Sequence, residues 1–190
     1  MKALDDISFT ANGGEVLALM GENGAGKSTL LKVLNGDYQQ TSGEYLVNGE
    51  PCHFNSPREA VAAGIGVIYQ ERQIMLELTV GENIFLGRLP TGFMGRIKMR
   101  EVHSRAQAII DEFGLDMKST DKVKDLSVAY QQMVEIMKAY SRENLKMIAF
   151  DEPTASLSDS EIDSLFRIIR KLKAEGKVII YVSHRMAEIR

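Results

Sequence analysis

Short apolar runs alternate with longer amphipathic segments along the chain. Two of the longer segments, residues 101–113 and 158–175, place apolar side chains at helical spacing. Four runs have the length and apolar character of buried strands: residues 15–20, 65–69, 147–150 and 177–182. Strands that alternate with helices favour a mostly parallel sheet covered by helices, so the pattern predicts an α/β fold.

Turn and cap residues predict where several elements begin and end. The pair Asn48-Gly49 is typical of a tight hairpin turn and predicts a small antiparallel β element beside the main sheet. Ser127 is suited to cap a helix that runs to about Tyr140. Two further pairs have the spacing of a capping box at a helix start: Ser56 with Glu59, and Ser158 with Glu161.

Residues 74–141 contain no convincing strand pattern, although the segments on either side of them do. We therefore predict a helical subdomain over residues 74–141. It is inserted into a sheet-containing core made of residues 1–73 and 142–190.

Composition restricts the class of protein only mildly. The 190 residues are 44% hydrophobic and carry 23 cationic and 26 acidic side chains, for a net charge of −3. That balance argues against a dedicated nucleic-acid binder, which usually has a basic face. Cys52 is the only cysteine, so an intramolecular disulfide is impossible and a reducing compartment is expected. No apolar run approaches the length of a membrane span, and the N-terminus does not resemble a secretory signal.

The strongest chemical motif follows the first strand and opens a helix. It matches the phosphate-binding pattern G-x-x-x-x-G-K-[ST], in which backbone N–H groups and a helix start surround an anion. Lys27 is expected to reach the outer phosphates and Ser28 to bind Mg²⁺. A chance glycine-rich turn is the alternative, and the strand–loop–helix context argues against it. The predicted nucleotide-binding residues are Gly21, Glu22, Asn23, Gly24, Ala25, Gly26, Lys27, Ser28 and Thr29.

Carboxylates and other polar side chains follow three of the remaining strands. Asp151 and Glu152 end the strand at 147–150, where we expect Asp151 to hold Mg²⁺ and Glu152 to act as general base on water. An exposed acidic pair at a strand end is the plainer interpretation. Gln70 and His184 end two other strands, and we predict that Gln70 positions water or Mg²⁺ and that His184 donates to the γ-phosphate.

The order of these motifs resembles the ATPase domain of ABC transporters, which implies a P-loop nucleoside-triphosphatase fold. It is most similar to the group that imports ribose, galactose, xylose and related sugars. The resemblance spans nearly the whole chain. It rests on Gly21–Thr29, Gln70, Leu126-Ser127, Asp151–Thr154, Ser156–Asp159 and His184, with closer matches at residues 3–9, 56–60, 63–65, 81–87, 133–136 and 183–185.

The resemblance implies an ABC-type, monosaccharide-transporting ATPase that uses ATP and Mg²⁺. Two such domains, in one polypeptide or in a dimer, would close head-to-tail on two ATP molecules. Closure would drive a membrane-spanning permease subunit, contacted by the segment from Gln70 to about Arg96. A periplasmic or lipoprotein sugar-binding protein would be an indirect partner, and nucleic acid would not be one. The expected location is the cytoplasmic face of a bacterial cell membrane, as a peripheral protein.

The chain departs from the family pattern in its signature segment, which would contact ATP across the domain pair. That segment is Leu126, Ser127, Val128, Ala129 and Tyr130. The family generally has glycine where Ala129 stands, so we predict that the added methyl weakens the composite site. The chain also starts after the family's adenine-stacking aromatic and stops soon after His184. It therefore resembles the first half of a two-half polypeptide.

Three alternatives stay open from the sequence. The chain could bind ATP firmly and hydrolyse it poorly, because of Ala129. It could be a soluble ABC ATPase acting on DNA or ribosomes, although the long insertions or basic stretches of such proteins are missing. It could be another P-loop enzyme, although we find no guanine-reading Asn-Lys-x-Asp loop.

Overall fold

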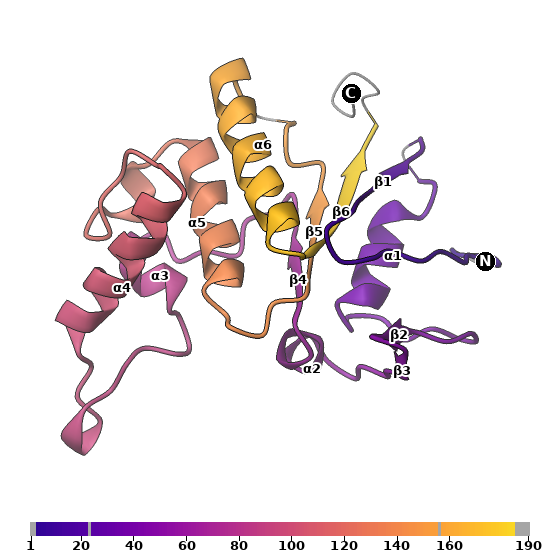
Figure 1. Cartoon of the computed structure of the whole chain (residues 1–190), viewed down its shortest axis with the longest axis horizontal. Helices are drawn as coiled ribbons and strands as arrows, with labels where there is room; N and C mark the ends of the chain where they lie inside the picture. The colour runs from indigo at the N-terminus through magenta and orange to yellow at the C-terminus, as the bar shows by residue number, and fades with distance from the viewer. Residues whose placement is uncertain (1–2, 23, 156, 185–190) are drawn as a thin grey trace. The chain divides into compact units, whose positions relative to one another are not determined.

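A single parallel sheet organises the first part of the molecule. The computed structural model describes residues 3–22, 24–155 and 157–184. Its main sheet has the strand order β1-β6-β5-β4, and all three pairings are parallel (Figure 1). The strands are β1 (Val16–Met20), β4 (Ile65–Ile68), β5 (Met147–Asp151) and β6 (Val178–Ser183). The predicted α/β fold with a mostly parallel sheet is confirmed.

The central strands are apolar on both faces because both faces are covered. In β5, Ile148, Ala149 and Phe150 are all fully buried, although their side chains alternate between the two faces. One face belongs to a core cluster that also contains residues of α1 (Lys27–Leu34) and α2 (Pro57–Ala62). Helix α1 contacts β5, and α2 contacts β4. The core therefore holds α1, and with it the glycine-rich loop, against the middle of the sheet.

The small antiparallel element forms where Asn48-Gly49 predicts it. It consists of β2 (Leu46–Val47) and β3 (Glu50–Pro51). Asn48 and Gly49 have φ values of 55° and 79°, as a hairpin turn of this type requires.

Only one of the two hydrogen bonds of the capping box predicted at Ser56 is formed, so the prediction is wrong for the other. The Ser56 hydroxyl accepts the Glu59 N–H at 3.4 Å, as expected. The Glu59 carboxylate, however, accepts the N–H of Asn55 at 2.9 Å, one residue before the cap. The start of α2 is thus still capped on both sides, but through the preceding turn.

A second compact unit is helical and comprises residues 71–143 and 154–168. Among its described residues no strand joins a sheet. Its elements are α3 (Val80–Ile84), the short η1 (Phe93–Gly95), α4 (Met99–Glu112), η2 (Val123–Asp125), α5 (Val128–Tyr140) and the first part of α6 (Asp159–Ala174). The sequence ranges had placed residues 154–168 with the core. In the structure they group with the helical unit. Within this unit the start of α6 contacts the start of α5 through Ser127 and Glu161.

Apolar side chains and buried polar groups together hold the helical unit. Helix α3 packs against both α4 and α5. The fully buried Asn83 accepts the N–H of Met75 at 2.8 Å and donates to its carbonyl at 2.9 Å. A capping box at Thr79 and Glu82, which the sequence analysis did not predict, starts α3.

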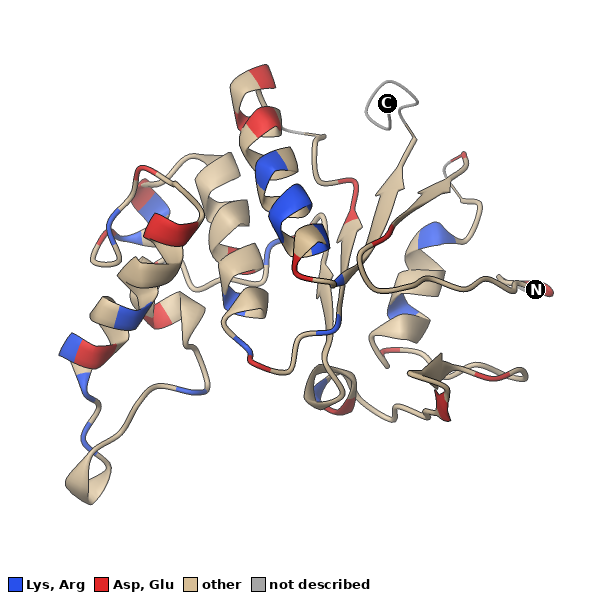
Figure 2. Cartoon of the chain, in the orientation of Figure 1, with Lys and Arg blue, Asp and Glu red and all other residues tan. Residues whose placement is uncertain are grey.

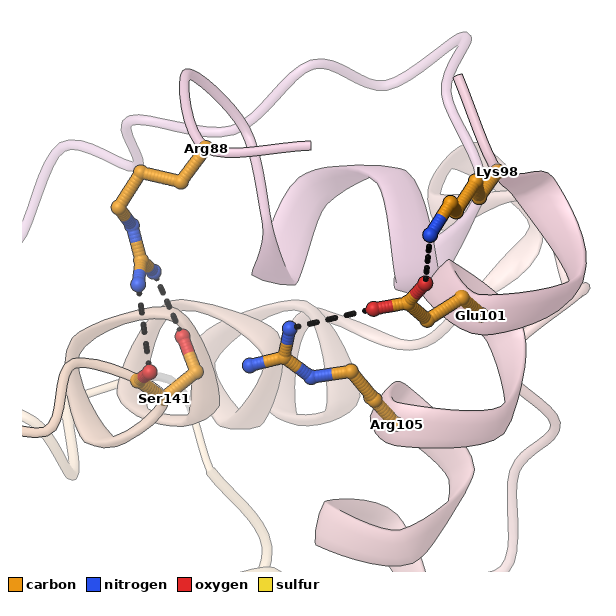
Figure 3. Close-up of polar contacts among 5 residues, drawn as sticks. All are labelled: Arg88, Lys98, Glu101, Arg105 and Ser141. Atoms are coloured by element: carbon orange, nitrogen blue, oxygen red, sulfur yellow. Dashed lines mark hydrogen bonds and ion pairs between the residues drawn. The ribbon is translucent and has the colours of Figure 1, made fainter. Parts of the chain in front are cut away.

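Figure 3 shows two further sets of polar contacts: one between Arg88 and the end of α5, and one among charged side chains at the start of α4. Arg88 donates to the Ser141 carbonyl at 3.2 Å and to its hydroxyl at 2.7 Å, which satisfies groups at the end of α5. Glu101 pairs with Lys98 at 3.4 Å and Arg105 at 3.8 Å (Figure 3). These pairs are exposed, and pairs of that kind contribute little to stability.

Helix α6 is amphipathic, as predicted. Its buried residues include Leu165, Ile169 and Leu172. Basic residues gather toward its C-terminal end, where their positive charges interact favourably with the negative end of the helix dipole (Figure 2). Within the described residues, no helix combines the length and apolarity that crossing a membrane requires.

Candidate active site

The register of the parallel strands brings the predicted site segments to one edge of the sheet. Met20 pairs with Ser183, Val182 with Asp151, and Phe150 with Ile68. Each strand therefore ends level with its neighbours. The residues that follow are the glycine-rich loop, His184, Glu152 and Tyr69-Gln70. This is the carboxyl edge, where ligands bind in open α/β sheets.

The glycine-rich loop has the backbone that a phosphate site requires. Gly24 and Gly26 have φ values of 85° and 92°. A Cβ on Gly26 would lie 2.7 Å from the carbonyl oxygen of Ala3, so only glycine fits there. Gly26 is also the N-cap of α1, and no side chain caps this helix start. Its first N–H groups are therefore available to an anion. Asn23, together with Ser156 and Arg185, lies outside the described residues.

Lys27 places a positive charge over this loop. Its Nζ donates to the carbonyl oxygens of Gly21 at 2.6 Å and Glu22 at 3.0 Å. The side chain is thus folded back toward the start of the loop. Thr29, also in the predicted set, is half-buried in the first turn of α1.

Ser28 and Asp151 meet beside the lysine. Ser28 lies close enough to Asp151 for its hydroxyl to lower the pKa of that carboxyl group by hydrogen bonding. Burial raises the pKa of Asp151, and the neighbouring Glu152 raises it further. The Ser28 hydrogen bond and the charges of Lys27 and Lys32 act in the opposite direction. The two residues predicted to share a metal ion therefore lie near one another.

Glu152 and His184 form a second contact at the same edge. The Nδ1 atom of His184 lies 3.1 Å from Oε1 of Glu152. The Glu152 N–H donates to the Val182 carbonyl at 3.0 Å, and its φ of 49° lies in the left-handed region. This turn leaves the Glu152 side chain 20% exposed. The carboxylate is thus accessible, yet oriented by an imidazole.

Gln70 is exposed directly after β4, and no contact described for it joins it to the other predicted site residues. Its neighbour Tyr69 was not predicted to take part. The Tyr69 hydroxyl donates to Asp37 at 2.7 Å, and Asp37 also accepts a 2.7 Å bond from Asn35 at the end of α1. Burial and this hydrogen bond raise the pKa of Tyr69. No local sequence signal marks this network, because its members come from separate segments.

The signature segment lies in the helical unit, at the start of α5. Ser127 is the N-cap of α5, and its hydroxyl accepts the Tyr130 N–H at 3.4 Å. Val128 is 40% exposed, whereas Ala129 is only 2% exposed, so the methyl group of Ala129 is covered by the protein itself. Leu126 and Tyr130 are half-buried.

Comparison with known proteins gives a consistent family. A family model described as ABC transporter matches residues 4–155. The arabinose import ATP-binding protein of Yersinia pestis is 53% identical over 187 residues, which cover 98% of this chain and 35% of that protein. The chain thus spans about a third of the length of such curated relatives.

Two solved structures extend the comparison to three dimensions. MJ1267, an ATP-binding cassette of an ABC transporter in its ADP conformation, aligns with a TM-score of 0.81 at 28% identity, over 98% of this chain and 77% of that chain. The dimeric post-hydrolysis state of the cassette MJ0796, bound to ADP and Pi, aligns with a TM-score of 0.79 at 26% identity, over 98% and 82%. Because the family model matches most of the sequence and these structures share its fold, the chain belongs to the ABC transporter family.

Proposed function

We propose that this chain is an ATP-binding and ATP-hydrolysing motor domain of a bacterial monosaccharide importer. The proximity of Ser28, Lys27 and Asp151 carries the proposal. It places a hydroxyl, a carboxylate and an ammonium group next to a loop whose backbone suits phosphate. Residues 21–29 would hold the triphosphate through backbone N–H groups and the start of α1.

Mg²⁺ is the cofactor that fits the donors at this position. Ser28 and Asp151 offer oxygen atoms, the ligand type that Mg²⁺ takes, and Gln70 could contribute its amide oxygen. Within the part of the chain that the structure describes, no three His, Cys, Asp or Glu side chains gather as a metal site. The remaining ligands would therefore be phosphate and water oxygens. Bound there, Mg²⁺ would neutralise charge on the phosphates.

Glu152 and His184 would carry the chemical step. Glu152 is suited to accept the proton of the attacking water as general base. His184 is close enough to orient that carboxylate and is suited to donate to the γ-phosphate oxygens. The contact supports paired roles for these two residues, because each alone would be an exposed polar side chain at a strand end.

The partners follow from membership of the family and from the named relatives. We propose that the domain pairs with a second ATPase domain, in the same chain or in a dimer, and acts on a membrane-spanning permease subunit. A periplasmic or lipoprotein sugar-binding protein would deliver the substrate. Arabinose is the first sugar to test, since several relatives of about 50% identity are named for its import. The protein would act peripherally at the cytoplasmic face of the membrane.

Binding and turnover assays on the full-length protein test this function. Lys27→Ala is expected to weaken Mg-ATP binding about a hundredfold, the loss of a strong interaction between two charged groups. Glu152→Gln is expected to keep Mg-ATP binding but to lower the turnover rate of the assembled transporter at least about a hundredfold. A parent protein without affinity for Mg-ATP would refute the proposal. So would a Glu152→Gln protein that hydrolyses ATP at the parent rate.

A further inference from the structure

One carboxylate joins the starts of two helices in the helical unit. Glu161, in the first turn of α6, accepts the Ser127 hydroxyl through Oε1 at 3.2 Å. Its Oε2 accepts the Ser158 N–H at 2.9 Å and the Ser158 hydroxyl at 2.8 Å. These bonds lower the pKa of Glu161, and the backbone hydrogen bond of Ser158 contributes most. Glu161 is thus an ionised group that contacts the signature segment.

The same carboxylate lies on the wall of a hollow. The hollow has a volume of about 330 Å³ and is lined by the first turns of α5 and α6. Ala129 and Tyr130 contribute from α5, and Ser160, Ser164 and Glu161 contribute from α6. Among the lining residues, Glu161 is the one that carries a charge.

The hydrogen-bonding capacity of Ser127 is limited. A serine hydroxyl has a single proton to donate. In this structure the Ser127 oxygen accepts from the Tyr130 N–H while its proton points to Glu161. The same proton cannot serve a phosphate oxygen at the same time. A contact of the Ser127 hydroxyl with ATP, which the resemblance to the family implies, requires the bond to Glu161 to break.

We propose that Glu161 is a positioning residue that holds the Ser127 hydroxyl turned toward α6 and thereby opposes closure of the signature segment on ATP. The inference rests on the proposed function. Under this inference, Glu161, which lies outside the motifs quoted for the family, controls how readily the signature segment closes on ATP. Because the bond to Glu161 occupies the Ser127 proton, replacing this carboxylate by an amide is expected to release the hydroxyl.

Glu161→Gln in the full-length protein, assembled with its permease, tests this role. The glutamine oxygen can still accept the Ser158 N–H, while the amide can donate to Ser127 and release its proton. The KM for ATP is expected to fall about three- to tenfold, the size of one ordinary hydrogen bond. The turnover rate kcat is expected to change less than about twofold.

Two comparisons separate this effect from a general change in charge or fold. Asp163→Asn removes an exposed carboxylate from the same helix and is expected to leave KM unchanged. In a Ser127→Ala background, Glu161→Gln is expected to have no further effect on KM, because Glu161 acts through the hydroxyl that is now absent. Glu161→Ala also removes the contacts with Ser158 and is expected to lower the unfolding temperature. Glu161→Gln keeps an acceptor for the Ser158 N–H and is expected to keep the parent unfolding temperature.

The outcomes distinguish this inference from the function on which it rests. If the parent protein binds and hydrolyses ATP but Glu161→Gln has the parent KM, only the role of Glu161 is overturned. A fall in KM that persists in the Ser127→Ala background also overturns it. If the parent protein has no affinity for Mg-ATP, the proposed function fails and this inference fails with it.

Discussion

At the scale of single residues, two pairs of neighbouring side chains lie at the candidate site. Ser28 with Asp151, and Glu152 with His184, are pairs whose members come from different strands or from a strand and a helix. Each residue was predicted from its position at a strand end or in the loop. The pairing itself was not predicted, since nothing local in the sequence specifies which strand ends adjoin. Gln70 was predicted in the same way, and its role stays a prediction.

Ala129 is the residue where the sequence suggested a weakened site. Its methyl group is covered by the protein, so it is not positioned to obstruct a nucleotide at the surface. Ala129→Gly is therefore expected to destabilise the start of α5 by about 0.5–1 kcal/mol and to leave ATP turnover of the assembled transporter unchanged. Thermal unfolding and turnover of the two proteins check this. Faster turnover in the glycine variant would instead support the sequence-based prediction that the methyl weakens the composite site.

At the scale of elements, side chains rather than a sheet hold the segment that follows Gln70. The Gln73 N–H donates to the carboxylate of Glu135 on α5, and the Gln73 carbonyl accepts from Lys138 at 3.2 Å. Met75 lies two residues after Gln73, and the Asn83 side chain binds both its backbone N–H and its carbonyl oxygen. Buried side chains thus satisfy backbone groups that a strand would otherwise pair.

Glu135 gives these contacts a measurable pH dependence. It is buried, and burial raises its pKa, although the Gln73 N–H and the nearby Lys138 and Arg72 act against the shift. A carboxyl whose pKa is higher in the folded protein stabilises the fold below its unfolded pKa. That stability is lost as the pH rises through the folded value.

Glu135→Gln keeps an acceptor for the Gln73 N–H and removes the titration. The urea midpoint of the glutamine variant, relative to the parent, is expected to rise between pH 4 and pH 7, a range that begins below the ordinary glutamate pKa of about 4.5 and extends well above it. Urea unfolding of the full-length protein at both pH values measures this. Glu44→Gln, an exposed change of the same charge, is the control and is expected to show no such trend. A relative midpoint that stays constant with pH would contradict the assignment.

At the scale of the whole molecule, the chain divides into a sheet-containing unit and a helical unit, and the candidate site residues divide with them. The loop, Asp151, Glu152 and His184 belong to the first unit, whereas the signature segment belongs to the second. Under the proposed function, each ATP would lie between the loop of one domain and the signature segment of another. The site would then be complete only in a pair of domains.

Pairing of this kind predicts a change in size that depends on ATP. In the full-length Glu152→Gln protein, Mg-ATP is expected to lower the radius of gyration, because bound ATP joins two domains and is not hydrolysed. Small-angle scattering with and without Mg-ATP measures this. A Lys27→Ala, Glu152→Gln protein should show no change. Identical scattering curves for Glu152→Gln with and without ATP would argue against closure.

The sequence alone determined the contiguous features of this protein. A glycine-rich loop, a helix cap or an apolar strand depends on residues a few positions apart, so residues 21–29, Ser127 and the strand at 147–150 could be identified directly. The tertiary structure decided what depends on strand order and helix packing: the proximity of Ser28 to Asp151, the contact between Glu152 and His184, the covered methyl of Ala129, and the bond between Glu161 and Ser127. These contacts join distant segments, and only the free energy of the whole packed chain selects them.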